Sequence, residues 1–311
     1  MNEVTTAGPV SQVSVAVPAT SANLGPGFDA LGLALARYDH VTVRRTAGGL
    51  QVSVVGEGAE VLPLDGRHLV VRALRCAFDR LGGQPAGLAV HCRNSIPQGR
   101  GLGSSAAAIV AGVIAARALT GGCGPAQCPN GPPGPAMDDA GVLALGTELE
   151  GHPDNVAACL FGGFTLAWGD ADGTHAVRLP VAEVTVTALV PPFEASTAAV
   201  RCLIPASVPH RDATVNAARA ALLVEALGRR PELLFEATVD RLHQSYRAPA
   251  MPASAELMAQ LRARGIPAVI SGAGPTVLVL GPHAVGLAGP AGWRAFALEV
   301  DTVGATVTAR E

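Results

Sequence analysis

A glycine-rich segment, PQGRGLGSSAAAIV at residues 97–110, constrains this chain more than any other part of its sequence. The alternating residues 87–97 before it are typical of a strand, and the alanine-rich run 104–119 after it predicts a helix. Such a loop can bind phosphate, because glycine permits close backbone approach and the N–H groups at a helix start attract anions. Ser104 and Ser105 offer a helix cap and hydroxyls for Mg²⁺ or a phosphate oxygen. A glycine turn with a serine cap and no ligand remains the alternative on spacing alone.

Three better-known interpretations of this loop fit the sequence poorly. A Walker loop needs a lysine after its last glycine, but all 22 basic residues of this chain are arginines. A dinucleotide loop needs a third glycine where Ser104 stands and an acid about 20 residues later, and none follows before Asp138. A serine hydrolase would need a G-x-S-x-G elbow, which GLGSSA lacks.

Composition narrows the class of protein further. With 311 residues, 49% of them hydrophobic and 15% charged, the chain can form two domains with ordinary cores. The net charge of -3 argues against nucleic acid as a partner. No apolar run reaches the roughly 20 residues of a membrane span, and the first residues do not resemble a signal peptide, so we expect a cytoplasmic protein. Cys123 and Cys128 lack a zinc-site spacing, and we expect reduced thiols.

Strand-like and helix-like segments alternate irregularly along the whole chain. Because these segments do not follow a regular βαβ repeat, the sequence predicts an α+β fold. The pattern of segments changes after about residue 169, which predicts two domains. Pro18 is expected to end a first strand, and the Gly48-Gly49 pair to join two strands in a hairpin. The Pro/Gly-rich segment 121–137 is expected to be a surface excursion.

Four motifs in order resemble one enzyme family. PATSANLGPGFD at 18–29 is a polar turn after a strand, and by itself it is compatible with an ordinary Asx turn. Together with the glycine loop, with GHPDNVAACLFGGF at 151–164 and with SGAGPT at 271–276, it resembles the GHMP small-molecule kinases. Within that family the motifs are most similar to the branch that acts on homoserine.

The resemblance implies a fold and an activity. The fold would be the two-domain GHMP kinase fold, with a ribosomal protein S5 domain 2-like ATP-binding domain at 1–168 and a ferredoxin-like substrate domain at 169–311. The activity would be ATP-dependent phosphorylation of L-homoserine to O-phospho-L-homoserine, a step of threonine biosynthesis. ATP and Mg²⁺ would be the cofactors, and the enzyme would be a cytoplasmic homodimer that binds neither nucleic acid nor membrane.

The resemblance also implies which residues bind the nucleotide. The glycine loop would wrap the ATP phosphates through its backbone, over Pro97, Gln98, Gly99, Arg100, Gly101, Leu102, Gly103, Ser104, Ser105, Ala106 and Ala107. Mg²⁺ would replace the missing lysine and would be held by Ser105 and Glu148, with Ser104 and Glu150 as the alternatives. Glu148 and Asn155 would be the catalytic residues.

The same resemblance places the substrate between the domains. Asp29 would pair with the ammonium group of the amino acid. The planar guanidinium groups of Arg201 and Arg247 suit its carboxylate. Asn23, His152 and Asn155 would position the amino acid and its hydroxyl. We expect no strong base, so that the proton leaves to a phosphate oxygen. The alternatives are a GHMP kinase for mevalonate, a sugar or shikimate, and an inactive nucleotide-binding module.

Overall fold

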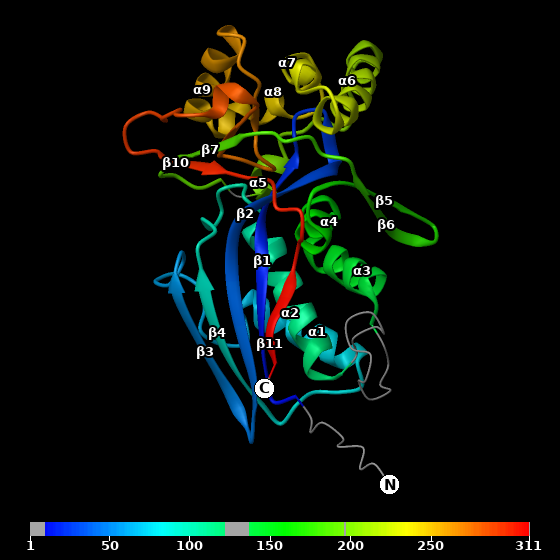
Figure 1. The fold of residues 1–311 in the computed structure, drawn as a ribbon, viewed down its shortest axis with the longest axis vertical. Coiled ribbons are helices and arrows are strands. Elements are labelled where there is room, and N and C mark those ends of the chain that lie inside the picture. Colours follow the sequence, from blue (N-terminus) through cyan, green and yellow to red (C-terminus); the bar gives the residue numbers. More distant parts are fainter. Residues whose placement is uncertain (1–9, 122–136, 196, 311) are drawn as a thin grey trace.

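The molecule is elongated and has two parts stacked along its long axis (Figure 1). It is a computed structural model that describes residues 10–121, 137–195 and 197–310. Cys123, Cys128 and nearly all of the segment 121–137 lie outside the described residues. Within the described part of the chain, no helix is long and apolar enough to cross a membrane.

The first part is a seven-stranded sheet with helices against one face (Figure 1). Its strands follow the order β11-β1-β2-β4-β3, and β5 pairs with β2 and with β6. They are β1 (Gln12–Asn23), β2 (Gly27–Thr46), β3 (Gly49–Gly56), β4 (Gly87–Asn94), β5 (Phe164–Asp170), β6 (Gly173–Leu179) and β11 (Thr306–Arg310). The helices are α1 (Leu69–Arg80), α2 (Ser104–Leu119), α3 (Asp139–Glu150) and α4 (Asp154–Phe161).

Two local expectations about this sheet are wrong. Pro18 does not end β1, because the strand continues to Asn23 through a register shift between Pro18 and Ala19. β11 pairs with β1 only as far as Ala16, so Pro18 lies where one edge of the strand is no longer paired, a position where proline is tolerated. The Gly48-Gly49 turn does not join a hairpin either. β3 pairs in parallel with β4, which lies between β3 and β2.

The second part is a four-stranded antiparallel sheet covered by helices (Figure 1). Its strands are β7 (Val186–Val190), β8 (Ala268–Ile270), β9 (Val277–Leu280) and β10 (Arg294–Leu298), in the order β10-β7-β9-β8. Numbered within the sheet, this is 4-1-3-2, the strand order of a ferredoxin-like fold. The helices are α5 (Thr197–Arg201), α6 (His210–Gly228), α7 (Leu234–Ala237), α8 (Gln244–Arg247) and α9 (Pro252–Ala263), with 3₁₀ turns η1 (Pro231–Leu233), η2 (Ala248–Ala250) and η3 (Pro282–Ala284). The prediction of an α+β chain in two parts is confirmed.

The two parts are not consecutive halves of the chain. β5 runs across residues 168 and 169, and β6 extends the first sheet through its pairing with β5. β11 returns from the second part to pair with β1. The boundary at 168/169 stays a prediction, and the sheet pairing adds the last strand to the first part.

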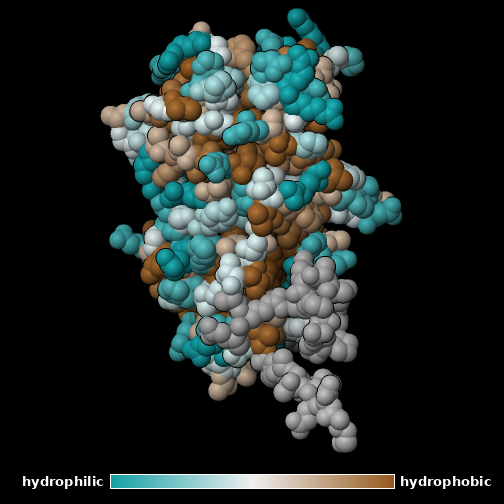
Figure 2. All heavy atoms as spheres, in the orientation of Figure 1, coloured by the Kyte–Doolittle hydropathy of each residue, from teal (hydrophilic) through white to brown (hydrophobic). Residues whose placement is uncertain are grey.

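The core of the first part depends on close packing of α1 against α2. Gly112 of α2 makes this possible, since a Cβ there would lie 2.7 Å from the backbone oxygen of Val70 and 2.8 Å from the Cβ of Ala73. α2 is buried along almost its whole length, which is typical of a helix that is apolar on all sides. On the face in Figure 2, hydrophilic residues gather over α6, and apolar residues reach the surface mostly in the middle.

Candidate active site

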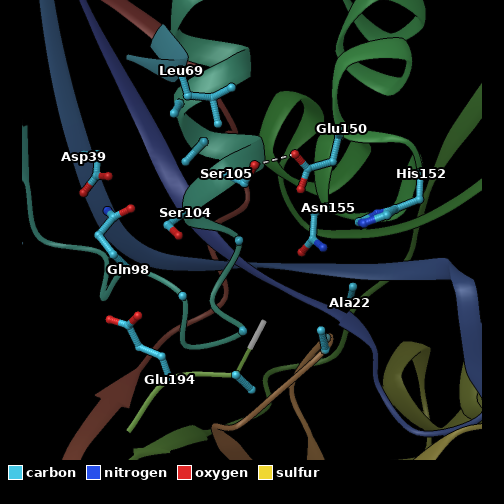
Figure 3. Close-up of a pocket in the computed structure, with 18 of the residues that line it drawn as sticks. Ala22, Asp39, Leu69, Gln98, Ser104, Ser105, Glu150, His152, Asn155 and Glu194 are labelled. Carbon is cyan, nitrogen blue, oxygen red and sulfur yellow. Dashed lines mark hydrogen bonds between the residues drawn. The ribbon is translucent and has the colours of Figure 1, made fainter. Parts of the chain in front are cut away.

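A cavity of about 400 Å³ lies where the two parts meet, and it is lined by residues of all four sequence motifs. Its walls come from β1 and β2, from the glycine loop with the start of α2, from the segment joining α3 to α4, and from residues 272–274 of the second part. Figure 3 shows one end with Ser105, Glu150, His152 and Asn155, and the other with Asp39 and Gln98. Segments far apart in the chain therefore share one site.

The backbone of the glycine loop has dihedral angles that residues other than glycine rarely adopt. Gly99, Gly101 and Gly103 have φ angles of 61°, 78° and 71°, in the left-handed region. A Cβ on Gly101 would overlap the backbone oxygen of Ser271, and one on Gly103 would overlap the hydroxyl of Thr20. The loop is thus held between both parts of the molecule, and its glycines are required by backbone conformation and by close contact.

The helix after the loop begins as predicted but without the predicted cap. Gly103 is the N-cap of α2 and makes no side-chain hydrogen bond, so the expectation of a serine cap is wrong. Because Ser104 and Ser105 are the first helical residues, their hydroxyls are not needed to close the helix and face the cavity. A helix start without a side-chain cap next to a left-handed loop is a site for an anion.

Most of the predicted loop residues line the cavity. These are Gln98, Gly99, Gly101, Gly103, Ser104, Ser105 and Ala107. Leu102 and Ala106 are instead fully buried. Arg100 points away, donating to the backbone oxygen of Pro192 at 2.9 Å. Pro97 does not line the cavity either. The side chains of these four residues therefore support the loop, and only the backbone of this stretch is available to a ligand.

The acidic residue next to the loop is Glu150. Its Oε2 accepts a hydrogen bond from the Ser105 hydroxyl at 2.6 Å, and both line the cavity (Figure 3). Burial raises the pKa of Glu150, partly offset by the Ser105 hydrogen bond. The choice of Glu148 is corrected: Glu148 does not line the cavity and pairs with Arg80 at the surface. Residues two positions apart point to different sides of a helix, so only one of these two glutamates can face the loop.

The turn after α3 forms a second polar cluster. Asp154 is 1% exposed, and its Oδ1 accepts from the backbone N–H of Asn155 at 2.7 Å and contacts His152 Nδ1 at 2.7 Å. Burial acts to lower the pKa of His152, but the hydrogen bond and charge of Asp154 outweigh it, and the pKa is raised. Asn155 Oδ1 accepts from the Thr20 hydroxyl at 2.8 Å. Both His152 and Asn155 line the cavity as predicted.

The turn between β1 and β2 carries the predicted Asn23 and Asp29. Both have positive φ, 68° and 55°, which is uncommon for residues other than glycine. Asn23 holds the turn: its Oδ1 accepts from the backbone N–H of Asp29 at 2.9 Å, and its Nδ2 donates to the backbone oxygen of Gly272 at 3.0 Å. The Asp29 side chain therefore points into the cavity from a fixed backbone.

The two predicted arginines meet this turn from the second part. Arg201 donates to both carboxylate oxygens of Asp29, at 2.9 and 2.8 Å. Arg247 is 2% exposed and donates to the backbone oxygen of Gly272 at 3.2 Å. Both guanidinium groups lie over the ring of Phe28, at 5.6 and 5.2 Å. The structure brings all predicted substrate residues together, but it pairs Asp29 with Arg201 directly.

The far end of the cavity contains a residue that the sequence analysis missed. His68 is 3% exposed, and its Nδ1 accepts from the backbone N–H of Val70 at 3.3 Å. Its Nε2 is buried and has no hydrogen-bond partner among the residues that the structure describes. Burial lowers the pKa of His68 and so favours the neutral ring, and because Nδ1 accepts from Val70, the neutral ring carries its proton on Nε2. A buried donor without an acceptor in a cavity wall suits a ligand that supplies one.

Asp39 lines the same end of the cavity. Its Oδ1 accepts from the backbone N–H groups of Ser95 and Ile96, at 2.6 and 2.9 Å. Burial raises its pKa to about 6, although these two hydrogen bonds act in the opposite direction. Asp39 thus anchors the residues just before the glycine loop. No local sequence pattern marks either His68 or Asp39.

The residues fit a nucleotide with a divalent ion. The loop has the geometry to cradle an anion, and His68 offers a donor at the far end. Mg²⁺ is held in proteins by one or two carboxylates together with phosphate oxygens and water, which matches Glu150 and Ser105. Within the described residues, no group of three or more His, Cys, Asp and Glu could hold a metal by itself. A metal here would therefore depend on the phosphates.

Comparison with known proteins identifies the family of this chain. Residues 68–163 match the N-terminal domain of GHMP kinases, and residues 218–286 match their C-terminal domain. A homoserine kinase of Streptomyces avermitilis is 57% identical, over 97% of this chain and 98% of that protein. One of Leifsonia xyli is 50% identical, over 95% and 91%.

Solved structures share the whole architecture. The crystal structure of homoserine kinase from Cytophaga hutchinsonii has a TM-score of 0.81 and 26% identity, covering 98% of this chain and all of that one. A mevalonate diphosphate decarboxylase from Enterococcus faecalis, at 16% identity and a TM-score of 0.66, shares the fold alone. The predicted two-domain GHMP kinase fold is confirmed, and the chain belongs to the GHMP kinase family, in its homoserine kinase branch.

Proposed function

We propose that this chain transfers the γ-phosphoryl group of ATP to the side-chain hydroxyl of L-homoserine, giving O-phospho-L-homoserine and ADP, a step of threonine biosynthesis. One observation carries the proposal. A single cavity joins an anion-binding glycine loop to a corner where Asp29, Arg201 and Arg247 offer both charges that an amino acid needs.

The nucleotide would lie along the loop. Its phosphates would accept from the backbone N–H groups between Gly99 and Ser105, and its base would extend toward His68 and Asp39. Ser105 and Glu150 would hold Mg²⁺, which when bound neutralises charge on the transferred phosphoryl group. No lysine is needed, because backbone dipoles and the metal supply the positive field.

The amino acid would lie at the other end, with its ammonium on Asp29 and its carboxylate on Arg201 and Arg247. Its hydroxyl would then lie near His152 and Asn155, beside the start of α2. Fixing two charges and leaving the hydroxyl free aims the nucleophile at the phosphoryl group, which is the main requirement of this reaction.

The proton of the hydroxyl would leave to a phosphate oxygen. His152 is engaged with Asp154, and its raised pKa favours the protonated ring, which donates a hydrogen bond instead of accepting a proton. Asp29 is paired with a guanidinium group. Glu150 is paired with Ser105 at the proposed metal position. The side chains near the hydroxyl therefore suit binding better than general-base work.

The decisive experiment is ADP release coupled to a reporter, with L-homoserine compared with L-serine, L-threonine and mevalonate. We expect turnover with L-homoserine that requires Mg²⁺ and is at least about 100-fold more efficient than with the others. Equal turnover with mevalonate, which has no ammonium group, would replace this proposal by another GHMP kinase activity. No turnover with any alcohol would favour an inactive nucleotide-binding module.

We also propose that the enzyme is a cytoplasmic homodimer, as the family resemblance implies. Light scattering after size-exclusion chromatography measures the mass directly. A mass of one chain, 31.3 kDa, at micromolar concentration would contradict the dimer.

A further inference from the structure

The carboxylate of Asp29 and the guanidinium group of Arg201 neutralise each other in this structure. The contact has two hydrogen bonds, of 2.9 and 2.8 Å, in the parallel geometry that makes arginine–carboxylate pairs strong. It raises the pKa of Arg201. The partners come from β2 of the first part and α5 of the second, so the pair also joins the two parts across the cavity.

Arg201 is the partner that is free to move. Its side chain is 42% exposed, and Asp29, at 32%, extends from a backbone fixed by Asn23. Arg247 is in contrast 2% exposed and held on two sides. It donates to the oxygen of Gly272 and contacts Nδ1 of His243 at 3.2 Å. A ligand carboxylate can therefore rest on Arg247 and draw Arg201 away from Asp29.

From this geometry we propose that the Asp29–Arg201 ion pair selects the substrate. Only a zwitterion can separate the two side chains without a cost in binding free energy, and we call the pair a charge lock for this reason. An amino acid replaces both partners at once, because its ammonium takes Asp29 and its carboxylate takes Arg201. The number of ion pairs in this part of the cavity does not fall, and neither Asp29 nor Arg201 is left with an unpaired charge. The inference rests on the proposed function and names the property by which the site selects its substrate.

A ligand with only one charge pairs with one of the two side chains and leaves the other without a partner. A carboxylate without an ammonium takes Arg201 but leaves Asp29 unpaired in a corner that also contains the buried carboxyl group of Asp154. An ammonium without a carboxylate takes Asp29 and leaves Arg201 beside Arg247, whose positive charges repel each other. Both cases cost binding energy, since an unpaired, partly desolvated charge is unfavourable.

The lock makes a prediction that simple substrate binding does not. If Asp29 only bound the ammonium, Asp29→Asn would weaken homoserine and leave 4-hydroxybutyrate, which lacks the amino group, unaffected. If the pair is a lock, Asp29→Asn frees Arg201 and improves the use of 4-hydroxybutyrate. The converse holds for Arg201→Gln and 2-amino-1,4-butanediol, which lacks the carboxylate.

The test measures kcat/KM for these three alcohols with the wild type, Asp29→Asn and Arg201→Gln. For Asp29→Asn we expect homoserine to lose about 100-fold, mainly through KM, while 4-hydroxybutyrate gains about tenfold. For Arg201→Gln we expect 2-amino-1,4-butanediol to gain. Glu232→Gln, which breaks an exposed pair with Arg230, is the matched control and should change nothing.

Two results would overturn the lock. Unchanged or weaker use of 4-hydroxybutyrate by Asp29→Asn would show that freeing Arg201 brings no gain. Equal losses for all three alcohols would point to a merely structural role. Calorimetric titration of 4-hydroxybutyrate into both proteins separates the lock from the proposed function. A gain in binding to Asp29→Asn without any turnover of homoserine by the wild type would support the lock and reject the kinase activity.

Discussion

The hydroxyl of Ser105 donates to a carboxylate oxygen of Glu150 at 2.6 Å, linking the first turn of α2 to the last turn of α3. The two groups belong to helices that are separated by the segment 121–137 in the sequence. Under the proposed function, these two oxygen ligands would supply part of a magnesium site, and the phosphates and water would supply the rest.

Replacing Glu150 tests this site. We expect Glu150→Gln to lower kcat by roughly 100-fold or more, because the amide leaves the phosphoryl charge without the metal's full neutralisation. Glu148→Gln is the matched control, since Glu148 lies on another side of the same helix and pairs with Arg80. Steady-state rates over a range of Mg²⁺ concentrations measure both variants. A loss in Glu148→Gln with normal rates in Glu150→Gln would reverse the assignment.

His68 is expected to contribute to nucleotide affinity alone. His68→Ala removes the buried Nε2 donor, and we expect the KM for ATP to rise about tenfold while the KM for homoserine stays the same. ADP should also raise the melting temperature of this variant less than that of the wild type.

His68 also accepts from the N–H of Val70 at the start of α1, so a helix effect needs a control. His68→Asn keeps an acceptor for that N–H and separates helix stability from nucleotide binding. If His68→Ala binds ADP as tightly as the wild type does, the base end of the cavity lies elsewhere.

Asp39 gives the protein a specific dependence of stability on pH. Its pKa is about 6 in the folded protein against an ordinary value of 3.8, so folding favours the protonated form. The stability contributed by this group is greatest at low pH and is lost as pH rises through 6. The full pKa shift corresponds to about 3 kcal/mol of unfolding free energy. Roughly 1.5 kcal/mol of this is lost between pH 5 and pH 7.5.

Urea unfolding of wild type and Asp39→Asn at these two pH values isolates the effect. The amide still accepts from Ser95 and Ile96 but cannot ionise, so the variant should not show this loss of unfolding free energy. Parallel curves for the two proteins would mean that Asp39 is ionised at little cost in the folded state.

Gly103→Ala is expected to destabilise the protein and weaken ATP binding together. The new Cβ would overlap the hydroxyl of Thr20, and φ is 71°. We expect a loss of about 2 kcal/mol or more in unfolding free energy. Gly265 has a similar φ of 76°, and a Cβ there would have no atom of the described residues within 4 Å, so Gly265→Ala measures the cost of the angle alone. Equal losses in both variants would remove the contact with Thr20 from the explanation.

Local sequence signals predicted the loop and the helix 104–119, because each depends on neighbouring residues, and the family resemblance supplied the motif residues that line the cavity. Contacts between residues that lie far apart in the sequence could not be predicted. The choice between Glu148 and Glu150 depends on how α3 is rotated against α2. The contact of Asp29 with Arg201 joins positions 172 residues apart. The role of His68 could be inferred only from the structure, in which the N–H of Val70 at the start of α1 occupies Nδ1 and leaves Nε2 for a ligand.

The return of β11 to pair with β1 makes the second part an insertion within the first. During synthesis on the ribosome, the edge of β1 stays open until the whole second sheet has emerged, and an open strand edge can pair with a neighbouring nascent chain. The larger sheet can therefore be completed only after the second part of the molecule has been synthesised, so the cavity between the two parts also takes its final form no earlier than that.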